Sequence, residues 1–191
     1  NFSCSAAQQG NNAVPLNNNS YSMTYVDQDG PAFPGTFNSS RATLSLPAGC
    51  TVLFAGLYWG ARQTNSSGGL VFGDIDQMLL RLPGDVAYRA IAADDTFGPA
   101  DSTRTYQRFA DVTSLVSARG SGNYWGANVV AGLGGDRYGG WSLVVAYRDA
   151  TAPLRNLTVF DGFSDVAPSS SETITLGPFL APVGGTVDAR L

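Results

Sequence analysis

Short segments rich in apolar and β-branched residues recur along this 191-residue chain at spacings of about 8 to 15 residues, separated by glycine- and proline-containing turns. Residues 41–46 alternate apolar and polar side chains, whereas residues 51–58 are apolar nearly throughout. Alternation is typical of a strand with one face in water, and a continuous apolar run indicates a buried central strand. The sequence therefore predicts an all-β fold, an antiparallel β-sandwich of the jelly-roll kind.

The strand pattern also predicts where the loops lie. We expect strands at residues 21–26, 41–46, 51–58, 74–82, 86–92, 123–131, 141–148, 156–162, 173–176 and 186–191. Residues 83–85 (Pro-Gly-Asp) are predicted to form a hairpin turn, residues 94–103 a polar loop and residues 132–140 a glycine-rich loop. These strands and loops account for most of the chain, so little helix is predicted.

One short helix is expected near residues 111–119. Asp111 would be its N-cap, and Gly120 would lie just past its end. No linker or internal repeat divides the rest of the chain, so residues 20–191 are predicted to form a single β-sandwich domain. Residues 1–19 form a small, polar N-terminal arm.

The charged residues are unusual in type and exclude several kinds of chemistry. All eleven basic residues are Arg, Glu172 is the only Glu, and there is no His. Without His there is no Ser-His-Asp or Cys-His catalysis, and without Lys there is no Schiff base or P-loop lysine. A net charge of −4 argues against nucleic acid as a partner, and the apolar runs are too short for a transmembrane segment.

The remaining candidates for catalysis are weak. Asp94 and Asp95 could act as a carboxylate pair on a glycosidic bond, but adjacent residues on a strand point to opposite faces. The glycine-rich loop at residues 132–140 leads into a strand and not a helix, so it lacks the helix amides of a phosphate-binding loop. We therefore expect a protein that is not an enzyme.

Two cysteines, Cys4 and Cys50, fit one disulfide that closes a loop of roughly 47 residues and adds about 4 kcal/mol of stability. The alternative is a pair of unpaired buried thiols. Few charged residues, much Asn, Ser, Thr and Gly, and a start at Asn1 without Met favour a secreted, extracellular protein whose signal sequence was removed. The disulfide, or docking on a neighbouring subunit, would order the N-terminal arm.

Four segments of sequence carry a resemblance to a known family: residues 25–30 (YVDQDG), 36–40 with 44–49 (TFNSS, LSLPAG), 52–60 (VLFAGLYWG), and 140–147 leading to 154–162 (GWSLVVAY, LRNLTVFDG). In this order they resemble the N-terminal β-rich domain of large exported bacterial surface proteins that carry tandem immunoglobulin-like repeats. The resemblance implies a calcium-tolerant β-sandwich with a structural or adhesive role at the cell surface. It implies no catalytic residue. Family members continue past the equivalent of Leu191. The resemblance therefore also implies that this chain is a fragment of such a protein or a shorter protein built on the same domain.

A calcium site is one candidate binding site. Asp27 and Asp29 form a D-x-D-G at a strand end, and Asp74 and Asp76 repeat the D-x-D spacing. Alternate carboxylates in an irregular loop can supply several of the six to eight oxygens that calcium needs. The alternative is that these residues only terminate strands, since Asp starts turns by bonding its own backbone.

A carbohydrate site is the second candidate. Tyr124, Trp125 and Tyr138, flanked by glycines, could stack on sugar rings, with Asp136 binding hydroxyl groups. Trp59 and Trp141 lie in the two most apolar runs and are expected in the core.

Self-assembly is the third candidate. Lysine is the usual guard of an exposed sheet edge, and this chain has none, so its edges could pair with strands of a neighbour. We expect a homo-oligomer formed through β-strand edges and the N-terminal arm, in an extracellular fibre or surface layer. A lectin-like adhesin module that binds carbohydrate is the alternative function, and a monomer with a folded-back arm the alternative state.

Overall fold

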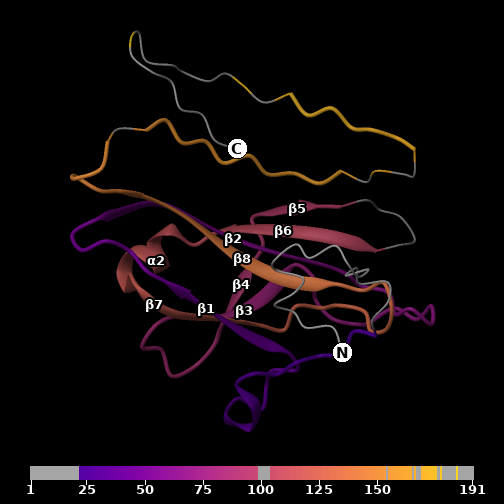
Figure 1. Ribbon diagram of the computed structural model, residues 1–191. Helices are drawn as coiled ribbons and strands as arrows, with labels where there is room; N and C mark the ends of the chain where they lie inside the picture. The colour runs from indigo at the N-terminus through magenta and orange to yellow at the C-terminus, as the bar shows by residue number, and fades with distance from the viewer. Residues whose placement is uncertain are drawn as a thin grey trace, which may run out of the picture.

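The computed structural model consists of two antiparallel four-stranded sheets packed together, with one short helix (Figure 1), which confirms the predicted β-sandwich. The structure describes residues 22–98, 104–153, 155–164, 166, 169–175, 177 and 184. The first sheet has the order β1 (Ser39–Leu44), β7 (Gly122–Ala127), β3 (Gln77–Arg81), β4 (Arg89–Ala92). The second has the order β5 (Asp95–Phe97), β6 (Thr105–Asp111), β2 (Thr51–Arg62), β8 (Gly139–Arg148).

Strand β2 organises the second sheet. It is twelve residues long and pairs with β6 on one side and β8 on the other. Leu57 and Trp59 point into the core and are at most 2% exposed, whereas Phe54 and Tyr58 lie on the opposite face. Both faces of β2 are therefore apolar, which is why its sequence runs nearly without polar residues and why the predicted central strand is confirmed.

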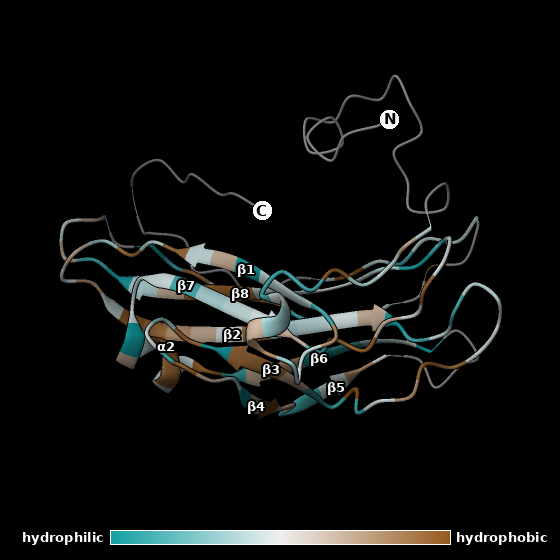
Figure 2. Cartoon of the chain, turned by 90° about the horizontal axis from the view of Figure 1, so that it is seen from below, coloured by the Kyte–Doolittle hydropathy of each residue, from teal (hydrophilic) through white to brown (hydrophobic). Residues whose placement is uncertain are grey.

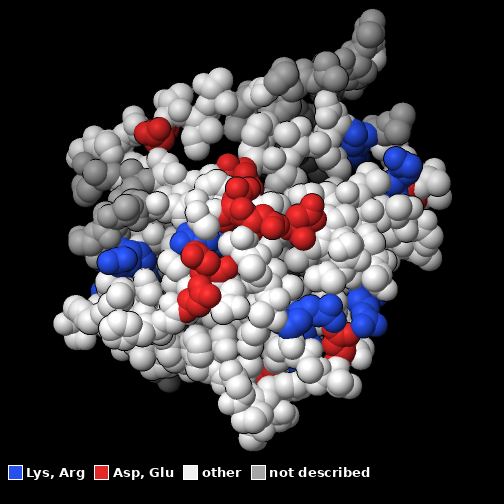
Figure 3. All heavy atoms as spheres, turned by 180° about the vertical axis from the view of Figure 1, so that it is seen from behind, with Lys and Arg blue, Asp and Glu red and all other residues white. Residues whose placement is uncertain are grey.

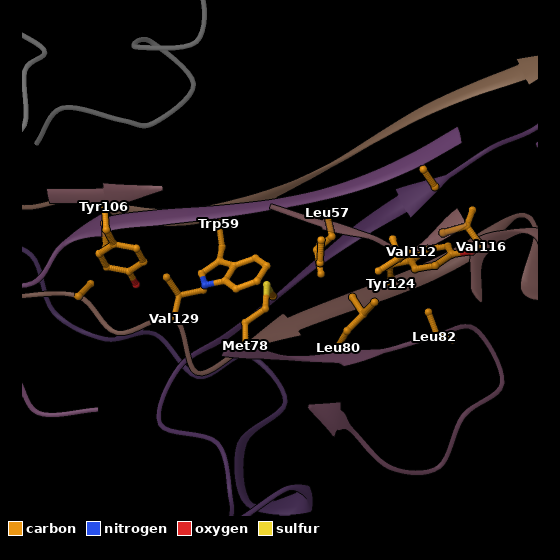
Figure 4. Close-up of a cluster of buried hydrophobic side chains, with 14 residues drawn as sticks. Leu57, Trp59, Met78, Leu80, Leu82, Tyr106, Val112, Val116, Tyr124 and Val129 are labelled. Carbon is orange, nitrogen blue, oxygen red and sulfur yellow. The ribbon is translucent and has the colours of Figure 1, made fainter. Parts of the chain in front are cut away.

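The core lies between the two sheets (Figure 4). Its largest fully buried side chains come from β2, β3, β7, the helix and the residue before the helix, and they are Leu57, Trp59, Met78, Leu80, Val112, Val116 and Tyr124. Burial of each such aliphatic or aromatic side chain contributes roughly 1.5–3 kcal/mol. Figure 2 shows hydrophobic and hydrophilic residues mixed along β1 and β3, as expected for strands with one face in this core.

Trp141 joins the edge of the second sheet to the first. A Cβ on Gly126 would lie only 2.4 Å from the indole Nε1 of Trp141, so only glycine leaves room for the ring there. The same Nε1 donates a hydrogen bond of 2.8 Å to Ser40 Oγ in β1. Trp141 packs against the core as expected, although it is half-buried.

The predicted helix is present as α2 (Thr113–Arg119). Val112 is its N-cap, one residue later than expected, but the Asp111 carboxylate still accepts a 2.8 Å hydrogen bond from the Thr113 amide. A side-chain hydrogen bond from Thr113, followed by this backbone one, lowers the pKa of Asp111. Gly120 lies just past the end with φ +64°, and its amide donates to the Val116 carbonyl.

Two strands occur where the sequence did not predict them. Strand β5 lies within the predicted polar loop, and β6 lies in a stretch to which no element was assigned. In β6 the inward-facing residues include Arg108, which is 8% exposed. A charged residue at an inward position hides the alternation that identifies a strand.

Other segments were predicted to be strands but are not strands in the structure. Residues 21–26 contribute only an isolated bridge between Met23 and Gly134 among the described residues. Residues 156–162 and 173–175 have no strand assignment and run outside the two sheets that the described residues form (Figure 1). Leu176, the predicted strand at 186–191 and the N-terminal arm at 1–19 lie outside the described residues. None of the helices described is long and apolar enough to cross a membrane.

Candidate functional site

The outer face of the second sheet carries an aromatic surface, formed by Phe54, Tyr58 and Phe109. The ring centroids of Tyr58 and Phe109 lie 5.1 Å apart, and those of Phe54 and Phe109 lie 6.3 Å apart in a stacked arrangement. The rings close over Gly56, where an added Cβ would lie 2.8 Å from Phe54 and 2.9 Å from Tyr58. This face is as apolar as a core face, although it lies outside the two-sheet sandwich.

The chain itself runs over this aromatic surface. Residues 155–164 pass above the second sheet (Figure 1), and the Tyr58 hydroxyl donates a 3.0 Å hydrogen bond to Asp161 Oδ2. Tyr58 is only 8% exposed as a result. Burial, followed by the hydrogen bond to Asp161 and its charge, raises the pKa of Tyr58 to about 12. The segment thus covers the sheet through a defined contact.

The cover is loose. Leu157 is 65% exposed, Val159 44% and Phe160 47%, although all three are large and apolar. A cleft of about 1090 Å³ remains between the sheet and residues 159–164, 172 and 174. Tyr58, Tyr138, Asp161 and Glu172 are among the residues that line it, and none of its described lining residues is basic. It is large enough for a small-molecule ligand or an extended peptide.

The second sheet also has one long edge strand, β8. β8 is a ten-residue edge strand whose only strand partner in the described part of the chain is β2. Its single charged residue is Arg148, at its end. Long edge strands with few charges present backbone groups to which another chain can add a strand.

The predicted carbohydrate residues do not form one site. Tyr124 is 1% exposed in the core, and its hydroxyl donates to the Gly120 carbonyl, so it offers no ring face to a sugar. Trp125 points outward from β7, but Arg41 and Arg81 lie over its ring, 5.5 and 4.9 Å from the centroid. The neighbouring glycines in the sequence predicted neither the burial of Tyr124 nor the arginines that cover Trp125.

The other two residues lie near β8. Tyr138 is 45% exposed and lines the cleft of the second sheet. Asp136 forms a 2.9 Å ion pair with Arg62, and its φ is +56°. Of the four predicted residues, Tyr138 alone lines this cleft.

Asp27 and Asp29, the first predicted calcium ligands, do lie together. Ser39 Oγ lies 2.8 Å from Asp27 Oδ1 and 2.7 Å from Asp29 Oδ1, so the two carboxylates share its single hydroxyl hydrogen, and Asp29 Oδ2 accepts a hydrogen bond of 2.6 Å from the Tyr88 hydroxyl. Burial acts to raise the pKa of Asp29, but hydrogen bonds from Tyr88 and Ser39 outweigh it and hold that pKa below its usual value. Hydroxyl groups satisfy these two carboxylates.

Asp74 and Asp76, the second predicted pair, lie at the turn before β3. Asp74 Oδ1 accepts the Asp76 amide at 2.9 Å, and Asp76 forms a 2.6 Å ion pair with Arg108. Within the described ranges no three Asp, Glu, His or Cys side chains gather as a metal site would require. The calcium site therefore stays a prediction without support from this geometry.

An arginine held between aromatic rings was not predicted. Arg81 lies 4.3 Å from the ring centroid of Phe33, 4.9 Å from that of Trp125 and 5.3 Å from that of Tyr88. These rings come from three separate parts of the chain, so no local pattern indicates the cluster. Its guanidinium joins the loop at residues 27–36 to the outer face of the first sheet. Figure 3 shows one face of the molecule with acidic side chains gathered near its centre and arginines around them.

The predicted disulfide is not seen. Cys50 is half-buried and carries a free thiol. Cys4 lies outside the described residues.

No family model, curated protein or solved structure matches this chain.

Proposed function

We propose that this chain is a non-enzymatic structural or adhesive subunit that assembles with copies of itself in an extracellular fibre or surface layer. One observation carries the proposal: an apolar outer sheet face lies beneath a loosely packed, extended segment, next to a long edge strand. Surfaces of this kind bury themselves by adding a strand or a sheet from a neighbour.

The composition supports the same proposal. The chain has no Lys to guard its edges and no His, which removes the commonest catalytic bases. Export to an oxidising compartment would allow Cys4 and Cys50 to join and tether the N-terminal arm. Intact mass under non-reducing conditions, before and after thiol alkylation, tests that disulfide directly.

Assembly is tested by light scattering over a wide concentration range, with negative-stain electron microscopy of the concentrated protein. We expect oligomers, filaments or sheets. The variant Val144→Lys puts a charge on β8 at a position that is 38% exposed, and we expect it to weaken assembly. Val86→Lys, at a loop position 91% exposed, is the matched control. A monomer at all concentrations would overturn the proposal.

A carbohydrate-binding adhesin is the second candidate, and the cleft beside Tyr138 favours it. Its residues include exposed aromatic and carboxylate side chains, which are the groups that stack on sugar rings and bind their hydroxyls. Glycan-array binding that is lost in both Tyr138→Ala and Glu172→Gln would support this function. Binding that persists in both variants would exclude the cleft as the sugar site.

A further inference from the structure

Residues 155–161, Arg-Asn-Leu-Thr-Val-Phe-Asp, are complementary to themselves. Arg155 and Asp161 lie at equal distances from Thr158 on either side, and so do Leu157 and Val159. When two such segments lie antiparallel and centred on Thr158, each Arg155 stands opposite an Asp161. Each Leu157 then stands opposite a Val159. Opposite charges and apolar residues that face each other across two strands are stabilising pairs.

In the structure this segment lies outside both sheets and is exposed to solvent, which suits such pairing. Residues 155–161 belong to neither sheet, and each of them is exposed. Leu157 and Val159, at 65% and 44% exposed, are β-formers that the monomer leaves largely in water. Their burial by a partner would release that apolar surface from solvent.

We infer that residues 155–161 of two copies pair as antiparallel strands about a two-fold axis at Thr158. This inference rests on the proposed self-assembly and names the contact through which it begins. A two-fold contact of this kind is isologous, since the same surface serves on both copies. Two isolated strands are only marginally stable in water, but here each lies over the aromatic surface of its own sheet.

Asp161 can serve both the monomer and the dimer. Its Oδ2 accepts the Tyr58 hydroxyl, which directs the side chain toward the sheet. Residues 155, 157, 159 and 161 of an extended strand share one face, so Arg155 of the second copy would approach on that same side. An ionised carboxylate has enough lone pairs to accept from a tyrosine and an arginine together.

Charge reversal tests the pairing. In Arg155→Asp, each symmetric pair becomes two carboxylates, and in Asp161→Arg it becomes two guanidinium groups. We expect each variant alone to dimerise about tenfold more weakly than the natural chain. An equimolar mixture restores both opposite-charge pairs, so the mixture is expected to form heterodimers more strongly than either variant dimerises alone.

Sedimentation velocity of each variant and of the mixture gives the result, with circular dichroism to check that both variants fold. If the natural chain assembles and both variants assemble equally well, the pairing is wrong while the proposed function stands. If the natural chain stays monomeric throughout, both fail. If the mixture associates no better than either variant alone, the antiparallel register is wrong.

A cysteine at the axis tests the register independently. In a background of Cys4→Ser and Cys50→Ser, the variant Thr158→Cys places two thiols opposite each other across the pair. Opposed residues of antiparallel strands have Cα atoms about 4.5–5.5 Å apart, which suits a disulfide. We expect rapid covalent dimerisation, with Val86→Cys as the exposed control. Equal rates for the two variants would overturn the proposed axis.

Discussion

The two outer faces of the sandwich are built from different chemistry. On the first sheet, the Arg81 guanidinium lies among the rings of Phe33, Tyr88 and Trp125, and Arg41 covers the same Trp125. On the second sheet, Phe54, Tyr58 and Phe109 contact one another, and no guanidinium is recorded over them in the described structure. Charged guanidinium groups therefore cover the rings of the first outer face, whereas the rings of the second contact one another.

The difference shows how each face meets its surroundings. A cation over an aromatic ring covers the ring and remains hydrated itself, so the rings of the first face need no further protein to shield them from water. The second face has no such shield, and residues 155–164 lie over it instead. The second sheet is therefore the face that gains most from a further layer of protein.

The largest expected effect comes from Phe109→Ala, which removes the central ring of the aromatic surface. Phe109 is half-buried, so we expect the free energy of unfolding to fall by about 2 kcal/mol, less than the roughly 3–5 kcal/mol of a fully buried phenylalanine. Urea denaturation measures the change. The control Val86→Ala, at a position 91% exposed, should change the stability by under about 0.5 kcal/mol. Equal effects would mean that the aromatic surface contributes no packing.

Arg81→Lys tests the first face with a smaller change. Lysine keeps the charge but loses the planar group that lies over three rings, so we expect a loss of about 1 kcal/mol. Arg41→Lys, over one ring at 5.5 Å, is the matched variant and should cost less. Thermal unfolding of both variants gives the comparison. An Arg81→Lys protein as stable as the natural one would show that charge alone shields this face.

Tyr58→Phe separates attachment of residues 155–164 from packing beneath them. The ring remains and only the hydrogen bond to Asp161 is lost, so global stability should fall by no more than about 1 kcal/mol. The segment itself should become more open, with faster proteolysis and faster amide exchange at residues 155–164. Unchanged exchange there would mean that other contacts hold the segment.

The smallest effect concerns high pH. The pKa of Tyr58, raised from 10.0 to about 12, means that the fold favours the neutral phenol. Its contribution to stability is therefore complete below about pH 10 and is lost as the pH rises toward 12. Ultraviolet difference titration of the natural chain against Tyr58→Phe should isolate one phenol that titrates near 12. A midpoint near 10 would show that residues 155–164 do not cover Tyr58.

The local sequence pattern correctly predicted those strands and helices whose own residues determine their structure. Residues 51–58 were predicted as a central strand and α2 was predicted from its end signals, and both are present. Strand β6 was missed because Arg108 faces inward, where Asp76 neutralises it. Tyr124 was expected at a binding site, but its place on β7 turns it into the core.

The aromatic surface and the Arg81 cluster could not be predicted, because each depends on contacts between distant segments. Phe54 and Phe109 are fifty-five residues apart, and β2–β6 pairing alone brings them together. Residues 156–162 have the sequence of a strand, but a strand also needs a neighbour in a sheet, and these residues belong to neither of the two sheets described. The N-terminal arm lies outside the described residues and stays a prediction.

The Arg81 cluster has a mechanical consequence. Phe33 belongs to the loop that precedes β1, and Arg81 and Trp125 belong to β3 and β7. Tension applied to the chain ahead of residue 33 would therefore reach β3 and β7 through the rings, as well as β1 through the hydrogen bonds that join Asp27 and Asp29 to Ser39. In a subunit of a fibre or surface layer, the Arg81 cluster would share the load with these hydrogen bonds, and its non-covalent contacts would re-form when the load is removed.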